Sequence, residues 1–196
     1  PEVLSFLYKV LEVHFGGALA AAQGGNTPQA QLHAGAVEAA LAALQAYGDW
    51  APVPQLMERG LLQAAAQLAA SSLEFRLAAI NFLHQVAGRK KMSDDGEAFC
   101  QAMGSLGESL LAASSHLLEA GLPDPDQEEF EFVKRLVDTL AIFGSQHLAT
   151  LPPARAPVLL WQLLGYARHP SLLVAAPAIP CWIALLREFQ LISEGR

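Results

Sequence analysis

Charged residues are scarce in this chain of 196 residues: they make up 16% of it, whereas hydrophobic residues make up 53%. This composition excludes an intrinsically disordered protein, because disorder is typical of chains with few apolar and many charged residues. Basic residues are also outnumbered, 12 against 19 acidic ones, so the net charge is −7. Domains that bind nucleic acids usually carry a basic excess. Any contact with RNA would therefore have to come from a local basic patch.

Cysteine and long apolar runs are rare as well. Cys100 and Cys181 are far apart and form no CxxC motif, so we expect reduced thiols in an intracellular protein rather than a disulfide scaffold. The longest apolar stretch, LLVAAPAIPCWIALL, contains Pro177 and Pro180 and is shorter than the roughly 20 residues of a membrane helix. We expect no membrane partner. Because the chain starts at Pro1, we interpret it as a piece of a longer protein.

Motifs that carry catalytic chemistry are missing. The glycine pairs at 16–17 and 24–25 lack the lysine and the spacing of a phosphate-binding loop, and no GxSxG motif occurs. Ser115 and His116 are adjacent on a predicted helix, so their side chains diverge and cannot form a nucleophile–base pair. The six histidines form no HExxH motif and no cluster at metal spacing. The sequence therefore predicts a protein that is not an enzyme and uses no cofactor.

Strand signals are lacking too, since β-branched residues are sparse and strict alternation is absent. Apolar residues recur instead at helical spacing. Corners rich in proline, glycine and aspartate separate these runs; at one of them Thr27 can cap a helix whose first residue is Pro28. The pattern predicts helices over residues 2–22, 28–47, 54–70, 73–87, 95–119, 125–150, 156–168 and 171–192.

Helical hairpins recur about every forty residues, which is the spacing of HEAT and armadillo repeats. Each predicted helix is apolar over a wider face than one partner can cover, so neighbouring hairpins must stack. We therefore predict an all-α fold, an α-solenoid of antiparallel helical hairpins with about four or five repeats, as a single run over residues 1–196. The pattern leaves an irregular helical bundle without repeats as the alternative.

The stretch YGDWAPVPQL, residues 47–56, predicts how one corner is built. Gly48, Pro52 and Pro54 end one helix and reverse the chain, and Tyr47 and Trp50 are expected to pack the corner. The same packing role is assigned to three aromatic residues elsewhere: Phe75, Trp161 and Trp182.

Four stretches also match a known family. VEAALAALQAYGDWAPVPQL has an aromatic–x–x–Trp–x–Pro corner, and LEFRLAAINFLHQVAGRKK has a Phe-Arg-x-x-Ala helix that leads into a basic loop. The later helices of this family are matched by two further stretches, EEFEFVKRLVDTLAIFGSQHLATL and HPSLLVAAPAIPCWIALLRE. From about Leu32 onward the chain resembles the exportin branch of the karyopherin-β superfamily, which consists of HEAT-repeat nuclear transport receptors. Within this branch it is most similar to the exportin-5 type, called HASTY in plants.

The resemblance implies an internal segment from the first half of a nuclear export receptor. The full protein would bind Ran-GTP, a structured RNA such as a microRNA precursor or a tRNA, and phenylalanine-glycine nucleoporins, and would shuttle between nucleus and cytoplasm. Duplex RNA would be recognised by its shape and backbone. Another HEAT-repeat scaffold or adaptor without transport activity is the alternative. Exposed repeat ends could also let the chain self-associate.

If the resemblance holds, four basic residues are candidate contacts for RNA or pore proteins: Arg76, Arg89, Lys90 and Lys91. The alternative for the loop is a solvated segment whose charges pair with Asp94 and Asp95. The alternative for Arg76 is a bond to the neighbouring repeat with its stem packed on apolar surface.

Four acidic residues form a candidate loop facing Ran, which is basic: Asp124, Asp126, Glu128 and Glu129. Alternatively, these acids only complement the dipole at a helix N-terminus. The tryptophans Trp50, Trp161 and Trp182 could likewise form slots for phenylalanine-glycine segments instead of packing the corners, which would require apolar surface exposed between repeats.

Overall fold

A computed structural model describes residues 2–91, 96–120 and 127–194. Over this part of the chain helices dominate and no strand occurs, so the all-α prediction is confirmed. The chain forms two compact units, Pro1–Val86 and Ala87–Arg196. In each of them, helices that are neighbours in sequence pack on one another, which is the packing of a helical-repeat solenoid.

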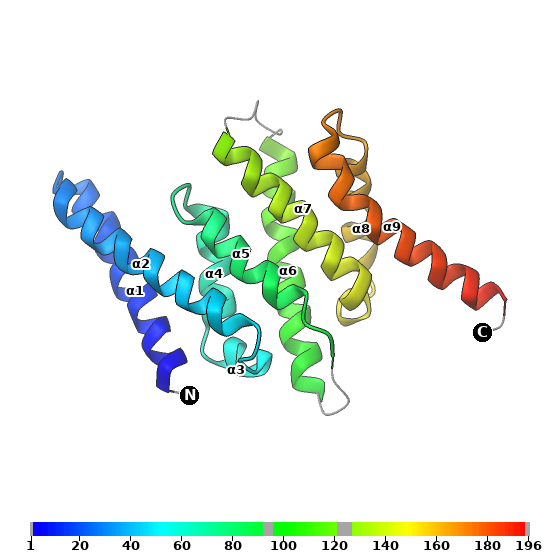
Figure 1. Ribbon diagram of the computed structural model, residues 1–196, viewed down its shortest axis with the longest axis horizontal. Helices are drawn as coiled ribbons and strands as arrows, with labels where there is room; N and C mark the ends of the chain where they lie inside the picture. The colour runs from blue at the N-terminus through cyan, green and yellow to red at the C-terminus, as the bar shows by residue number, and fades with distance from the viewer. Residues whose placement is uncertain (1, 92–95, 121–126, 195–196) are drawn as a thin grey trace. The chain divides into compact units, whose positions relative to one another are not determined.

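Unit 1, Pro1–Val86, contains the hairpin of α1 (Glu2–Gln23) and α2 (Thr27–Gly48), whose helices run antiparallel (Figure 1). It continues with α3 (Val53–Glu58), α4 (Leu61–Ser71) and α5 (Arg76–Ala87). The last residue of α5, Ala87, is the first residue of unit 2. α1 packs on α2 along its length and also contacts α4. One face of α1 is therefore covered by two helices.

The turn between α1 and α2 differs from the prediction in its cap. Asn26, not Thr27, is the N-cap of α2, and its side chain accepts a hydrogen bond from the backbone N–H of Gln29 at 3.3 Å. Thr27 is already the first helical residue. Asparagine is among the strongest N-cap residues, so the helix starts one residue before the predicted position.

The predicted single helix over 54–70 is divided in two. α3 ends at Glu58, and Gly60 adopts the left-handed conformation, with φ at +74°, before α4 begins. Glycine takes this conformation without steric cost. A Cβ atom at Gly60 would also lie 2.9 Å from Cε2 of Tyr8, so the missing side chain lets the ring of Tyr8 lie against the turn.

Unit 2, Ala87–Arg196, contains α6 (Glu97–Ala120), α7 (Gln127–His147), a short 3₁₀ helix η1 (Leu148–Thr150), α8 (Ala156–Ala167) and α9 (Leu172–Ser193). α7 packs on α6, α8 and α9, while α8 contacts α6 and α9. Successive helices reverse direction (Figure 1). The predicted helix over 125–150 ends earlier than expected, because α7 ends at His147 and the next three residues form η1.

α7 and α9 approach closely at one glycine. A Cβ atom at Gly144 would lie 2.8 Å from Sγ of Cys181. α9 can therefore pack this closely on α7 only because Gly144 has no side chain. Cys181 is buried, and this burial raises the pKa of its thiol to about 11. The thiol therefore acts as a small apolar group in the contact.

Two helices are long and apolar enough to cross a membrane by length and composition, α1 and the Leu172–Leu191 part of α9. The expectation that the α9 stretch is too short is corrected, because the helix continues through Pro177 and Pro180 for 22 residues. Helices that pack inside soluble proteins pass the same test, so it is weak evidence for a span. α1 packs on α2, and α9 packs on α7 and α8.

Candidate functional site

The basic loop follows the end of α5. Arg89 is half-buried, and Lys90 and Lys91 are exposed. Asp94 and Asp95, the acids proposed to pair with this loop, lie outside the described residues. Arg76 is half-buried at the start of α5. Because α5 has 12 residues, its two ends are roughly 18 Å apart at the rise of an α-helix. Arg76 belongs to unit 1, whereas the other three basic candidates belong to unit 2.

His147 holds the start of the basic loop. Its side chain is 3% exposed, and Nε2 donates a hydrogen bond to the backbone oxygen of Ala87 at 3.1 Å. The rings of Phe99 and Phe143 lie 5.9 and 5.6 Å from its own. Burial lowers the pKa of His147, although hydrogen bonds with the backbone of Ala87 and Arg89 oppose the shift. The imidazole is therefore neutral at pH 7 and anchors this segment to α7.

The contact between His147 and Ala87 could not be predicted from the sequence. The partner of His147 lies 60 positions earlier in the chain, so no local pattern connects the two residues. The one local signal is a histidine at the end of an apolar helix, and it does not predict which residue the histidine contacts.

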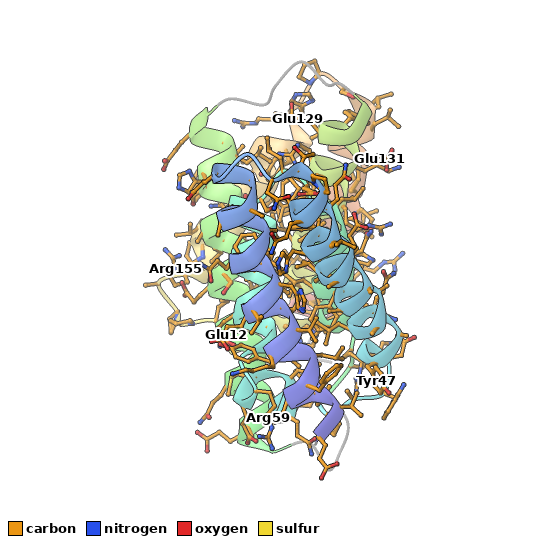
Figure 2. All side chains as sticks on the ribbon, turned by 90° about the vertical axis from the view of Figure 1, so that its left-hand side faces the viewer. Glu12, Tyr47, Arg59, Glu129, Glu131 and Arg155 are labelled. Atoms are coloured by element: carbon orange, nitrogen blue, oxygen red, sulfur yellow. The ribbon has the colours of Figure 1, made fainter. Side chains whose placement is uncertain are left out.

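Of the acidic set, Asp124 and Asp126 lie outside the described residues, and only the backbone of Glu128 is described. Glu129 is half-buried in the first turn of α7, where the helix dipole favours acids. Figure 2 labels Glu129 and Glu131 on this helix.

The exposed face of α7 carries both signs of charge. Lys134 pairs with Glu131 at 3.8 Å, and Arg135 pairs with Asp138 at 3.5 Å. These four side chains and Pro177 of α9 line a cavity of about 170 Å³. Exposed pairs of this kind contribute little to stability, and they make this surface mixed in charge rather than acidic.

The predicted packing residues of the 47–56 corner are half-buried or exposed. The rings of Tyr47 and Trp50 lie 4.7 Å apart at 47°, and Trp50 is 66% exposed. Figure 2 shows Tyr47 at the C-terminal end of α2. Pro52 is the exposed N-cap of α3, and Pro54 is half-buried within that helix.

The other aromatic residues occupy both buried and exposed positions. Phe75 is 2% exposed and contacts the ring of Phe15 edge-on at 6.1 Å. Trp161 on α8 is 70% exposed. Trp182 on α9 is half-buried, and its Nε1 has no hydrogen-bond partner among the described residues. Trp50 and Trp161 therefore offer apolar surface to a partner, whereas Phe75 belongs to the core.

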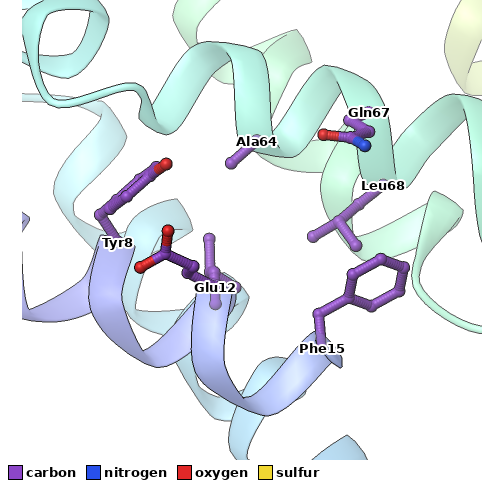
Figure 3. Close-up of a pocket in the computed structure, with 7 residues that line it drawn as sticks. Tyr8, Glu12, Phe15, Ala64, Gln67 and Leu68 are labelled. Atoms are coloured by element: carbon purple, nitrogen blue, oxygen red, sulfur yellow. The ribbon is translucent and has the colours of Figure 1, made fainter. Parts of the chain in front are cut away.

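A cavity of about 280 Å³ lies between α1 and α4 (Figure 3). We call it the α1–α4 pocket, and its lining residues are Tyr8, Leu11, Glu12, Phe15, Ala64, Gln67 and Leu68. None of them was a candidate from the sequence. The only signal is the spacing of Tyr8, Glu12 and Phe15, which places them on one face of α1. No three of the described His, Cys, Asp and Glu residues lie close enough to hold a metal ion.

Comparison with known proteins shows which family the chain resembles. The model of the Exportin-5 family matches residues 127–194. Protein HASTY 1 of Arabidopsis thaliana is 34% identical over 194 residues, which cover 96% of this chain and 16% of that protein. Exportin-5 of Dictyostelium discoideum is 24% identical over 152 residues, 75% of this chain and 13% of that protein. The chain thus spans about a sixth of HASTY 1, and it is an exportin-5/HASTY-like sequence.

Proposed function

We propose that this chain is a non-catalytic scaffold segment of a nuclear export receptor. The observation that carries the proposal is the similarity to HASTY 1, which extends over 96% of the chain. The complete protein binds Ran-GTP and a structured RNA of the microRNA-precursor or tRNA type. It contacts phenylalanine-glycine nucleoporins and shuttles between nucleus and cytoplasm.

The basic loop is the part of this chain that suits RNA. Lys90 and Lys91 are exposed, and His147 holds the segment from which they extend. Lysine ammonium groups contact phosphates without reading bases, which fits recognition of duplex RNA by its shape and backbone. Arg89 and Arg76 are half-buried and contribute less. The basic loop is therefore an auxiliary phosphate contact within a larger surface.

The acidic start of α7 suits a basic protein such as Ran. Glu129 supports this role from the described residues, and Asp124, Asp126 and Glu128 complete the proposed contact. Complementary charge mainly speeds encounter and selects the partner. The exposed indole of Trp161 supports a contact with phenylalanine-glycine segments, because aromatic side chains are enriched where proteins associate.

Cooperative binding by the complete protein tests the proposal. Hairpin RNA is titrated onto the protein with Ran-GTP, with Ran-GDP, or without Ran. We expect a much higher RNA affinity with Ran-GTP than in either control. Binding of neither ligand, or independent binding of the two, would overturn the transport proposal and favour a HEAT-repeat adaptor that grips other proteins.

A variant with Lys90→Gln and Lys91→Gln tests the basic loop separately. Each lost phosphate contact flattens the salt dependence of binding, so we expect the slope of log affinity against log salt to fall by about two. Ran-GTP binding serves as the control and should not change. An unchanged slope would remove the loop from the RNA contact.

We also propose that the isolated chain self-associates through α9. Large apolar side chains of this helix are exposed, and they include Leu172, Leu173, Ile179, Ile183, Leu186 and Phe189. A second copy could cover this surface, since apolar patches of this kind mark protein contacts. Light scattering should show dimers or larger species that dissociate in the Leu186→Glu and Phe189→Glu variant. A clean monomer at high concentration would contradict this.

A further inference from the structure

The α1–α4 pocket combines aromatic walls, an apolar floor and one carboxylate. Tyr8, Glu12 and Phe15 come from α1, and Ala64, Gln67 and Leu68 come from α4 (Figure 3). Both helices belong to unit 1 and contact each other there. The pocket is thus built within one unit of the chain.

The two aromatic walls are held by their surroundings. Tyr8 lies against Gly60, where a Cβ atom would approach its Cε2 to 2.9 Å. Phe15 contacts the ring of Phe75 edge-on at 73°, and Phe75 is almost fully buried. Side chains fixed by packing lose little freedom when a ligand binds, so a pre-formed site of this kind favours affinity.

The charge of the pocket is negative. Glu12 is the charged member of the seven lining residues. Its nearest basic neighbour on α1 is Lys9, at 4.0 Å, and the two side chains are 55% and 73% exposed. A pair at that distance and exposure is weak, so a ligand cation can replace Lys9. The amide oxygen of Gln67 can accept a further hydrogen bond.

We propose that the α1–α4 pocket binds an arginine side chain of a partner protein. The guanidinium stacks on the ring of Tyr8, one turn before Glu12 on α1, and pairs with the carboxylate of Glu12, while the aliphatic stem lies against Leu11 and Leu68. Aromatic faces attract cations, and a planar guanidinium suits both stacking and carboxylate pairing. A phenylalanine side chain would instead desolvate Glu12 without giving it a partner, which is unfavourable. The net charge of −7 also attracts basic partners.

Matched small probes test this assignment. The chain, with labelled leucine methyl groups, is titrated with the acetylated amides of arginine, citrulline and phenylalanine. Citrulline has nearly the shape of arginine without its charge. We expect arginine amide to shift the Leu11 and Leu68 methyl signals in a saturable way, and citrulline amide to bind about fivefold or more weakly.

Two variants separate charge from shape. Glu12→Gln should lower the affinity for arginine amide to that for citrulline amide, and Lys9→Gln, the matched control, should leave it unchanged or raise it. No saturable shift with arginine amide, tighter binding of phenylalanine amide, or equal affinities of the wild-type and Glu12→Gln chains would each overturn the proposal. Since the test uses neither Ran nor RNA, its failure is distinguishable from failure of the proposed function.

Discussion

The two units bury different kinds of side chain. In unit 1, the described side chains that are buried are apolar, and Val37, Leu44 and Phe82 are completely inaccessible. In unit 2 the buried set also includes four polar residues: Ser114, Thr139, His147 and Gln162. Both units thus follow the same helical-repeat pattern, but among the described residues only unit 2 has hydrogen-bonding side chains that are fully buried.

The buried polar groups of unit 2 connect helices. Ser114 on α6 and the hydroxyl of Tyr166 on α8 lie 3.0 Å apart. Gln162 donates from Nε2 to the backbone oxygen of Leu111 and to the hydroxyl of Ser115, at 3.3 and 2.7 Å. Hydrogen bonds need defined geometry, and a buried group left unpaired is costly. The buried hydrogen bonds of unit 2 therefore fix how its helices align with one another. We expect the stability of unit 2 to be more sensitive than that of unit 1 to polar substitutions and to pH.

The largest loss of stability should come from removing a buried aromatic side chain, and it should be similar in both units. Phe82→Ala in unit 1 and Phe143→Ala in unit 2 each remove a side chain that is fully buried. We expect each to cost about 3–5 kcal/mol of stability, since lost burial and the remaining cavity add. Urea unfolding combined with segment-resolved hydrogen exchange measures both the cost and the unit affected. A cost below about 1 kcal/mol in either unit would show that its core is loosely packed.

The next largest loss of stability should come from breaking a buried hydrogen bond of unit 2. Tyr166→Phe keeps the ring but leaves the buried hydroxyl of Ser114 without its partner. We expect a loss of about 1–2 kcal/mol, and a smaller loss when Ser114→Ala is added, because both polar groups are then removed. Equal losses in the single and double variants, measured by urea unfolding, would contradict a role for this bond.

The pH dependence of stability should come from unit 2. Burial lowers the pKa of His147 below its ordinary value of 6.5, so the unfolded chain binds a proton more readily than the folded one. Its contribution is fully present above pH 6.5 and is lost as the pH falls through the lowered pKa. Thermal unfolding between pH 7.5 and 5 should show this loss in the wild type and much less of it in His147→Gln. A parallel decline in both proteins would assign the effect to other groups.

The smallest effect concerns an ion pair at the surface of unit 2. Arg155 donates from Nε to both carboxylate oxygens of Glu108, at 3.0 and 2.8 Å, but both side chains are more than a third exposed. We expect Glu108→Gln to cost about 0.5 kcal/mol and to lose its effect at high salt. A cost of several kcal/mol in urea unfolding would show that this pair is essential to the unit.

The periodic helices were predictable from the sequence. The expected range 28–47 became Thr27–Gly48, and 156–168 became Ala156–Ala167, because apolar spacing and corner residues act locally. The break at Gly60 was missed, since a glycine inside an apolar run does not reveal its φ angle. The anchor at His147 and the α1–α4 pocket were missed because each joins residues far apart in sequence. The separation of Arg76 from the basic loop was predictable, because the expected helix over 73–87 already has Arg76 near its start and the loop after its end.

Export from permeabilised nuclei tests the central claim most directly. Nuclei loaded with labelled hairpin RNA are supplied with the complete protein and with Ran in its GTP or GDP form. We predict that the RNA leaves the nuclei only with the complete protein and Ran-GTP, and that an unstructured RNA of equal length is retained. Retention of the hairpin RNA under every condition, or its release without Ran-GTP, would contradict the claim that this chain belongs to a nuclear export receptor.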